Sequence, residues 1–184
     1  MAEFILELYS EEIPPQLQIN ARNELKQIFE KSIQEEGLKY KALKIYSSPT
    51  RLTLFIQNLS EKVKILSKEI KGPKVGVSDN ILENFINAQK VNKKDVFEKE
   101  IEKGKFYFVK TKPREILTQD LLTKIIPKSL NEISWKKSMK WSDNNLMWAR
   151  PLRSIVAIFN KSVLKFNYHH LMSTNSVIIE TDLI

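Results

Sequence analysis

Three tryptophans set among cations are the residues of this chain best suited to binding chemistry. One short window holds Trp135, Lys136, Lys137, Lys140, Trp141, Trp148 and Arg150, and Arg153 follows it. Indole rings offer stacking faces to bases while cationic groups pair with phosphates, as binding of single-stranded nucleic acid requires. Tryptophans also bury large apolar areas, with lysines along the wet edge of a core. We therefore expect the rings to lie in the core and the charges to face a polyanion.

Lysine supplies most of the positive charge of the chain. Among its 30 lysines and arginines, the arginines are Arg22, Arg51, Arg114, Arg150 and Arg153. The planar guanidinium suits bidentate pairing with phosphate or carboxylate, a geometry that lysine does not match. The proximity of Arg150 and Arg153 to Trp148 therefore indicates geometrically demanding partners. These are either phosphates or the chain's own carboxylate and carbonyl groups.

Motifs for catalysis, nucleotide binding or metal binding are absent from the sequence. The four glycines form neither a G-x-G-x-x-G fingerprint nor a P-loop, and the lack of cysteine excludes thiolate metal sites. Glu11 and Glu12 are adjacent and point apart, so we expect them to favour the positive end of a following helix rather than act as an acid–base pair. His169 and His170 are neighbours in an expected strand, where they face opposite sides at the solvent edge. We expect no catalytic residue and no metal site.

The overall charge favours a polyanionic partner. The net charge is +8 and the estimated pI is about 9.5. Glu3 and Glu7 stand where a secretory signal would carry bases, and no apolar run approaches membrane-spanning length. We expect a cytoplasmic protein without membrane contact, and a length of 184 residues suits one domain or one domain with a small appended unit.

Hydrophobic spacing predicts the elements that position these residues. Alternation predicts a strand over residues 3–9, and Pro14-Pro15 starts a helix that ends at Gly37. Strands are expected over 43–47 and 52–59, followed by an extended segment, 62–70, that ends at a Gly72-Pro73 turn.

The second half of the chain combines a small unit with a return to the main domain. A short helix starts at residue 79, and a hairpin around 103–105 places Phe106 and Phe108 on one face. A helical stripe from 117 to 126 should kink or end at Pro127, and residues 152–166 form two strands that turn near 160–161. These elements predict an α+β fold with a mostly antiparallel sheet and packed helices. Residues 1–72 and 113–184 form the main domain, and 73–112 form a small inserted helix-hairpin unit.

A family resemblance rests on motifs spread along nearly the whole chain. The most specific are Lys137-Ser138-Met139-Lys140-Trp141 and Trp148-Ala149-Arg150-Pro151-Leu152-Arg153; further motifs occupy residues 4–14, 49–52, 71–73, 84–91, 103–104, 106–107 and 155–157. In this order and spacing they resemble the N-terminal part of the beta subunit of the bacterial tetrameric glycyl-tRNA synthetase. The family usually carries arginine at the position of Lys140. Its glycine-histidine-arginine-phenylalanine stretch should follow the last strands, whereas this chain runs through residues 175–180 without it, so we expect a truncated or altered C-terminal segment.

The resemblance implies a component of glycine-tRNA ligase, an aminoacyl-tRNA synthetase that charges tRNA(Gly) with glycine using ATP. It implies that an alpha subunit holds ATP, magnesium and the adenylate chemistry in an alpha2-beta2 tetramer, and that this chain alone is inactive. The expected RNA- or partner-binding residues are Arg51, Lys71, Lys140, Trp141, Arg150 and Arg153. The alternatives are a module that docks the alpha subunit without touching RNA, an independent hydrolase that acts on mischarged tRNA, and a truncated remnant without activity.

Overall fold

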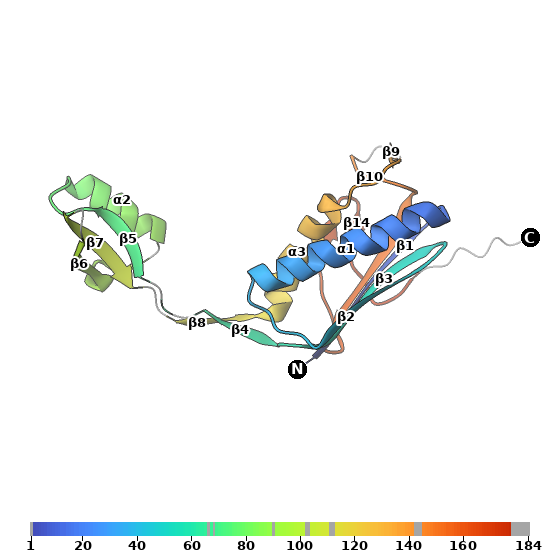
Figure 1. Cartoon of the computed structure of the whole chain (residues 1–184), viewed down its shortest axis with the longest axis horizontal. Coiled ribbons are helices and arrows are strands. Elements are labelled where there is room, and N and C mark those ends of the chain that lie inside the picture. Colours follow the sequence, from blue (N-terminus) through green and yellow to red (C-terminus); the bar gives the residue numbers. More distant parts are fainter. Residues whose placement is uncertain are drawn as a thin grey trace, which may run out of the picture. The chain divides into compact units, whose positions relative to one another are not determined.

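The computed structural model describes residues 2–65, 67, 69–89, 91–101, 104–110, 113–141 and 145–177. The chain forms two compact units (Figure 1). The first consists of Met1–Val63 and Ile116–Ile184, and the second consists of the intervening residues, Lys64–Glu115. These bounds are wider for the second unit than the expected 73–112. The reason is that residues 69–74 pair with a strand of the second unit rather than with the main sheet.

The first unit is built on a five-stranded antiparallel sheet. Its strands are β1 (Ala2–Ser10), β2 (Ala42–Ser48), β3 (Arg51–Leu59), β11 (Leu152–Phe159) and β12 (Ser162–Val163), in the order β12-β11-β1-β3-β2. Phe4, Leu6 and Leu8 alternate along β1 and are buried, as the sequence predicted. Asn160 and Lys161 adopt left-handed backbone angles and close the β11–β12 hairpin at the predicted turn.

Two helices complete the core of the first unit. Helix α1 (Pro15–Glu35) begins with proline at its first turn, where no backbone donor is needed, and buries Leu25, Phe29 and Ile33. Helix α3 (Thr118–Glu132) packs into the same core. Of the expected kink or end at Pro127, the end is wrong, because α3 continues through the proline to Glu132, and the kink stays a prediction. Leu122, Ile126 and Leu130 stay buried on either side of the proline, and this packing outweighs one lost backbone hydrogen bond.

The second unit is a three-stranded antiparallel sheet with one helix. Strands β5 (Glu69–Lys74), β6 (Val96–Ile101) and β7 (Gly104–Lys110) lie in the order β5-β7-β6, accompanied by α2 (Asp79–Gln89) and a short 3-10 helix, Lys93–Asp95. The β6–β7 hairpin confirms the predicted one, although Lys103 of its turn lies outside the described residues. The expected turn at Gly72-Pro73 is wrong, because both residues lie inside β5 at a register shift.

Short strand pairs complete the described chain. Strand β4 (Lys62–Ile65) pairs with β8 (Arg114–Leu117), β9 (Met139–Lys140) with β10 (Met147–Trp148), and β13 (Asn167–Tyr168) with β14 (Leu171–Met172). Leu117 therefore ends a strand instead of starting α3. The α+β class with mostly antiparallel sheets is confirmed. No helix in the described parts of the chain is both long and apolar enough to cross a membrane.

Replacing Gly72 by alanine should destabilise the second unit. A Cβ at this position would lie 2.6 Å from a ring carbon of Phe85 on α2, so the helix or the ring must move. Overpacking of this kind costs about 1–3 kcal/mol. We expect Gly72→Ala to lower the free energy of unfolding by that amount, measured by hydrogen exchange of the β5 and β7 amides. Phe85→Leu in the same chain should recover part of the loss, and a Gly72→Ala variant as stable as the parent would contradict the tight packing.

Tyr168 should make stability depend on pH in the alkaline range. Its side chain is buried in the core, its hydroxyl donates to Asn131 Oδ1 at 3.0 Å, and burial raises the pKa of Tyr168 to about 12. An unfolded tyrosine ionises near pH 10, so between about pH 10 and 12 the folded chain keeps a proton that the unfolded chain has lost. Stability therefore falls as pH rises through this window. Tyr168→Phe should show a shallower fall in urea unfolding between pH 10 and 12; identical slopes in the two proteins would refute this assignment.

Candidate functional site

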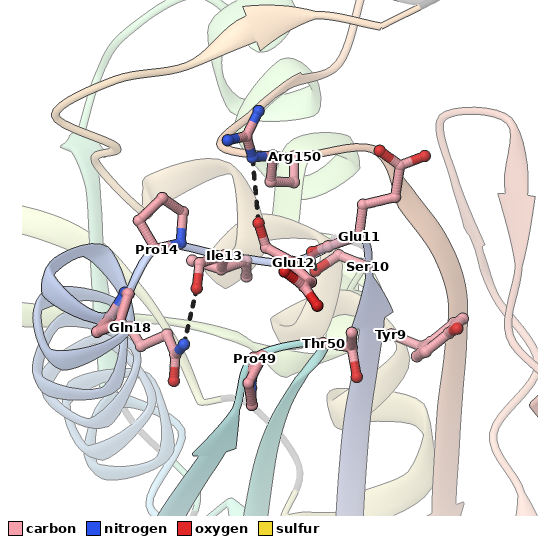
Figure 2. Close-up of a pocket in the computed structure, with 11 residues that line it drawn as sticks. Tyr9, Ser10, Glu11, Glu12, Ile13, Pro14, Gln18, Pro49, Thr50 and Arg150 are labelled. Carbon is pink, nitrogen blue, oxygen red and sulfur yellow. Dashed lines mark hydrogen bonds between the residues drawn. The ribbon is translucent and has the colours of Figure 1, made fainter.

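An open cleft of about 700 Å³ lies where β1 ends, and three segments far apart in sequence line it (Figure 2). The loop after β1 is tied to the β2–β3 turn by Ser10 N–H to Thr50 O (2.9 Å) and Ile13 N–H to Pro49 O (2.7 Å). Glu11 N–H donates to Pro151 O at 3.1 Å. These hydrogen bonds hold the walls of the cleft through the backbone, so its shape follows from the strand registers.

Arg150 and Gln18 hold the loop that follows β1 and lines the cleft (Figure 2). Arg150 Nε donates to the carbonyl oxygen of Glu12 at 3.1 Å, and Gln18 Nε2 donates to the carbonyl oxygen of Ile13 at 2.7 Å. The carboxylates of Glu11 and Glu12 remain at least partly in solvent. The cleft thus presents carboxylates and one guanidinium, a set that binds polar or charged groups and contains no nucleophile with a base.

Arg153 and Arg51 both pair with carboxylates of the same unit. Arg153 forms an ion pair with Glu11, and Arg51 Nε lies 3.4 Å from Glu7 Oε1. The Arg51 guanidinium also lies over the ring of Tyr9, 5.2 Å from its centroid. Of the two kinds of partner expected for arginine, the structure shows the internal one at each position. Glu11 was expected to favour the positive end of α1, but the helix begins at Pro15, its first turn holds no acid, and Glu11 pairs with Arg153 instead.

The prediction that the tryptophan rings lie in the core is confirmed for Trp148, and Trp135 and Trp141 are partly buried against that core. Trp148 is 1% exposed and meets Trp135 edge to face, with ring centroids 5.0 Å apart. Trp141 is half-buried and donates from Nε1 to the carbonyl oxygen of Trp148 at 2.9 Å. It also lines a second cavity of about 230 Å³, with Arg153 and His170 among the other lining residues. At Trp148, packing therefore uses the ring faces that stacking on a base would need.

The expected binding residues belong to both units. Lys140, exposed on the β9–β10 hairpin, donates to Asn145 Oδ1 at 3.3 Å. Lys71 belongs to the second unit, where its Nζ lies 3.6 Å from the centroid of Phe106. Arg150 lines the cleft, while Trp141 and Arg153 line the smaller cavity. Within the first unit, these residues thus lie at two cavities and on the exposed hairpin.

The histidines occupy a turn rather than a strand. His169 has a left-handed backbone (φ 52°), and with His170 it connects β13 to β14. Both side chains are exposed, as expected, but the strand placement was wrong. Within the described residues, no three histidine, aspartate or glutamate side chains are grouped to hold a metal ion.

Comparison with known proteins assigns the chain to a family. A sequence profile described as the glycyl-tRNA synthetase beta subunit matches residues 4–181. The chain belongs to the glycyl-tRNA synthetase beta subunit family. The match includes residues 175–181, where an altered segment was expected, although residues 178–184 lie outside the described structure.

Individual relatives agree with this assignment. The glycine-tRNA ligase beta subunits of Rickettsia canadensis and Rickettsia akari are 38% and 37% identical to this chain over 177 residues, which is 95% of its length. That of Rickettsia prowazekii is 34% identical over 177 residues, or 96%. In each case the match covers 26% of the relative, so the chain spans about a quarter of the length of these beta subunits.

Sequence reasoning identified Arg150 but missed the cleft around it. Tyr9, Gln18 and Thr50 line the cleft and were not singled out as site residues. The available signal was that residues 4–14, 49–52 and 148–153 all carry family motifs. Their meeting depends on the β1–β3 and β1–β11 registers, which the sequence pattern does not specify.

Trp148 should be essential to the stability of the first unit. Its ring is 1% exposed and packs against Trp135, so truncation leaves a cavity and removes the edge-to-face contact. Trp148→Ala should lower the free energy of unfolding by about 3–5 kcal/mol, the usual range for a large buried aromatic side chain. Trp141→Phe is the comparison variant, with an expected loss of about 1 kcal/mol from its hydrogen bond. Equal losses in urea unfolding would show that the two rings are not buried to different depths.

Proposed function

We propose that this chain is the N-terminal, non-catalytic part of the beta subunit of glycine-tRNA ligase. It supports the charging of tRNA(Gly) by contacting the tRNA, the alpha subunit or both. The observation that carries the proposal is the family match over residues 4–181. ATP and magnesium then act on the alpha subunit of an alpha2-beta2 enzyme, in the cytoplasm. The lack of a glycine-rich nucleotide motif in the sequence supports this division.

Contact with RNA phosphates is best supported on the β9–β10 hairpin and the segment before it. Lys136, Lys137 and Lys140 are exposed, and none of the ion pairs that the structure describes involves them. By contrast, Arg51 and Arg153 pair with glutamates, so their fields are partly cancelled at a distance. The lysines therefore contribute the stronger attraction for a polyanion.

Exposed methionines favour a second candidate function, docking of the alpha subunit without RNA contact. Met139 and Met147 lie on the same hairpin and are 59% and 47% exposed, and Met172 on β14 is 63% exposed. The unbranched, polarizable methionine side chain adapts to an apolar partner surface. These residues support a protein interface at least as well as an RNA interface.

Removing two hairpin charges should weaken tRNA binding and its dependence on salt. Each phosphate contact contributes about 0.9 to the slope of log K against log salt. We expect the variant Lys137→Gln with Lys140→Gln to lower that slope by about 2 in filter binding of a tRNA(Gly) transcript. The matched control is Lys26→Gln with Lys31→Gln on α1, which removes the same charge from lysines paired with Glu30 and Glu35.

The outcomes separate the candidates when alpha-subunit co-purification is measured on the same proteins. Equal losses in the hairpin and control variants would show diffuse attraction rather than a hairpin contact. Co-purification of the alpha subunit with no tRNA binding at low salt would favour docking alone. A chain that binds neither partner would contradict the proposal and favour the alternative that the chain is a truncated remnant without activity.

A further inference from the structure

The sheet of the second unit has one face covered by α2 and a second face on which rings and cations gather. Gly72 marks the covered face, since a Cβ there would meet the ring of Phe85 on α2. Lys71 points to the opposite face, because neighbouring residues in a strand alternate. Cross-strand pairing brings three rings, four lysines and one acid to this second face. They are Phe97, Phe106, Phe108, Lys71, Lys74, Lys99, Lys110 and Glu69. We call this set the open face.

Two of the three aromatic rings on the open face, Phe97 and Phe106, lie within reach of a flat ligand, whereas Phe108 is buried. Phe97 is 36% exposed and stacks on Phe108 with ring centroids 6.1 Å apart and planes 26° apart. Phe106 is half-buried, with the ammonium of Lys71 3.6 Å from its centroid. Lys99 lies 5.5 Å from the centroid of Phe108. Cations therefore sit directly beside ring faces instead of at the margin of the sheet.

The charge of the open face is strongly positive. Among its described residues, four lysines accompany a single acid, Glu69. Lys99 Nζ binds Glu69 Oε2 at 2.7 Å, and among the ion pairs that the structure describes, none joins Lys71 or Lys74 to a carboxylate. A ligand that fits must therefore be both flat in part and negatively charged.

We propose that the open face binds an unstacked, single-stranded segment of RNA. A base stacks on the exposed ring of Phe97, and Lys71 and Lys74 pair with the flanking phosphates. An exposed cation–π contact is weaker than base–aromatic stacking, so Lys71 can exchange the ring for a phosphate. The inference rests on the proposed function for the source of the strand, which is then the tRNA. Fully paired RNA is a poor ligand because its bases are already stacked.

The test measures fluorescence anisotropy of a labelled 12-nucleotide oligouridine with the full 184-residue chain. Phe97→Leu keeps an apolar side chain but removes the ring, and we expect about 5- to 100-fold weaker binding. Lys71→Gln with Lys74→Gln should lower the log–log salt slope by about 1.4, since each contact to a single strand contributes about 0.7. The control, Lys93→Gln with Lys94→Gln, removes the same charge from exposed residues of the 3-10 helix in the same unit. It should leave the slope nearly unchanged.

Three results would overturn the inference. These are unchanged affinity in Phe97→Leu, equal changes of slope in the two lysine pairs, or binding of a duplex of the same length as tightly as the single strand. Loss of alpha-subunit co-purification in Phe97→Leu with oligouridine binding intact would assign the face to a protein partner instead. If Phe97→Leu fails to fold, as judged by circular dichroism, Glu69→Gln decides the matter. Removal of the acid should tighten oligouridine binding, and an unchanged affinity would count against the proposal.

The same measurements separate this inference from the proposed function. If the parent chain binds tRNA and Phe97→Leu binds it equally well, the open face is not an RNA site, and the proposed function stands. Oligouridine binding that depends on Phe97, in a chain that binds neither tRNA(Gly) nor the alpha subunit, would retain the face and remove the proposed function.

Discussion

The register of β1 between β3 and β11 is the constraint on which the rest of the first unit depends. Phe4, Leu6 and Leu8 all point into the core, and a slip of one residue against either neighbour would turn all three toward the opposite face. The same register brings Ser10 to Thr50 and Glu11 to Pro151, where backbone hydrogen bonds close the cleft. The burial of apolar side chains thus also determines the position of polar groups at the end of the strand.

Arginine and lysine take different parts in this arrangement. Arg51, Arg150 and Arg153 each bond to a carboxylate or carbonyl of the same unit, and Arg150 and Arg153 thereby tie β10–β11 to the loop after β1. A rigid guanidinium suits such fixed partners, whereas a lysine ammonium is strongly hydrated and stays in solvent. The positive charge that the chain presents to solvent therefore comes mainly from lysines. A surface of lysines attracts phosphates without selecting their geometry.

The sequence predicted the elements better than their contacts. The alternation of β1, the proline start of α1 and the Asn160-Lys161 turn are local signals, and the structure confirms each of them. The expected end of α3 at Pro127 and the expected turn at Gly72-Pro73 are wrong because tertiary packing overrides a local breaker. Buried neighbours carry α3 through the proline, and Gly72 within β5 leaves room for the ring of Phe85. The cleft was not predictable, since it exists only where residues 10–15, 49–50 and 150 meet across two registers.

The two units also differ in how they use aromatic side chains. In the first unit, a five-stranded sheet, two helices and short strand pairs provide enough surface to bury Trp148 almost completely, so its ring faces are committed to packing. The second unit has three strands and one longer helix, which can cover one face of the sheet only. Rings on the other face then have lysine stems and each other as neighbours, and Phe97 stays exposed. In this chain, the phenylalanines of the small sheet are therefore better placed than the tryptophans to stack on a base.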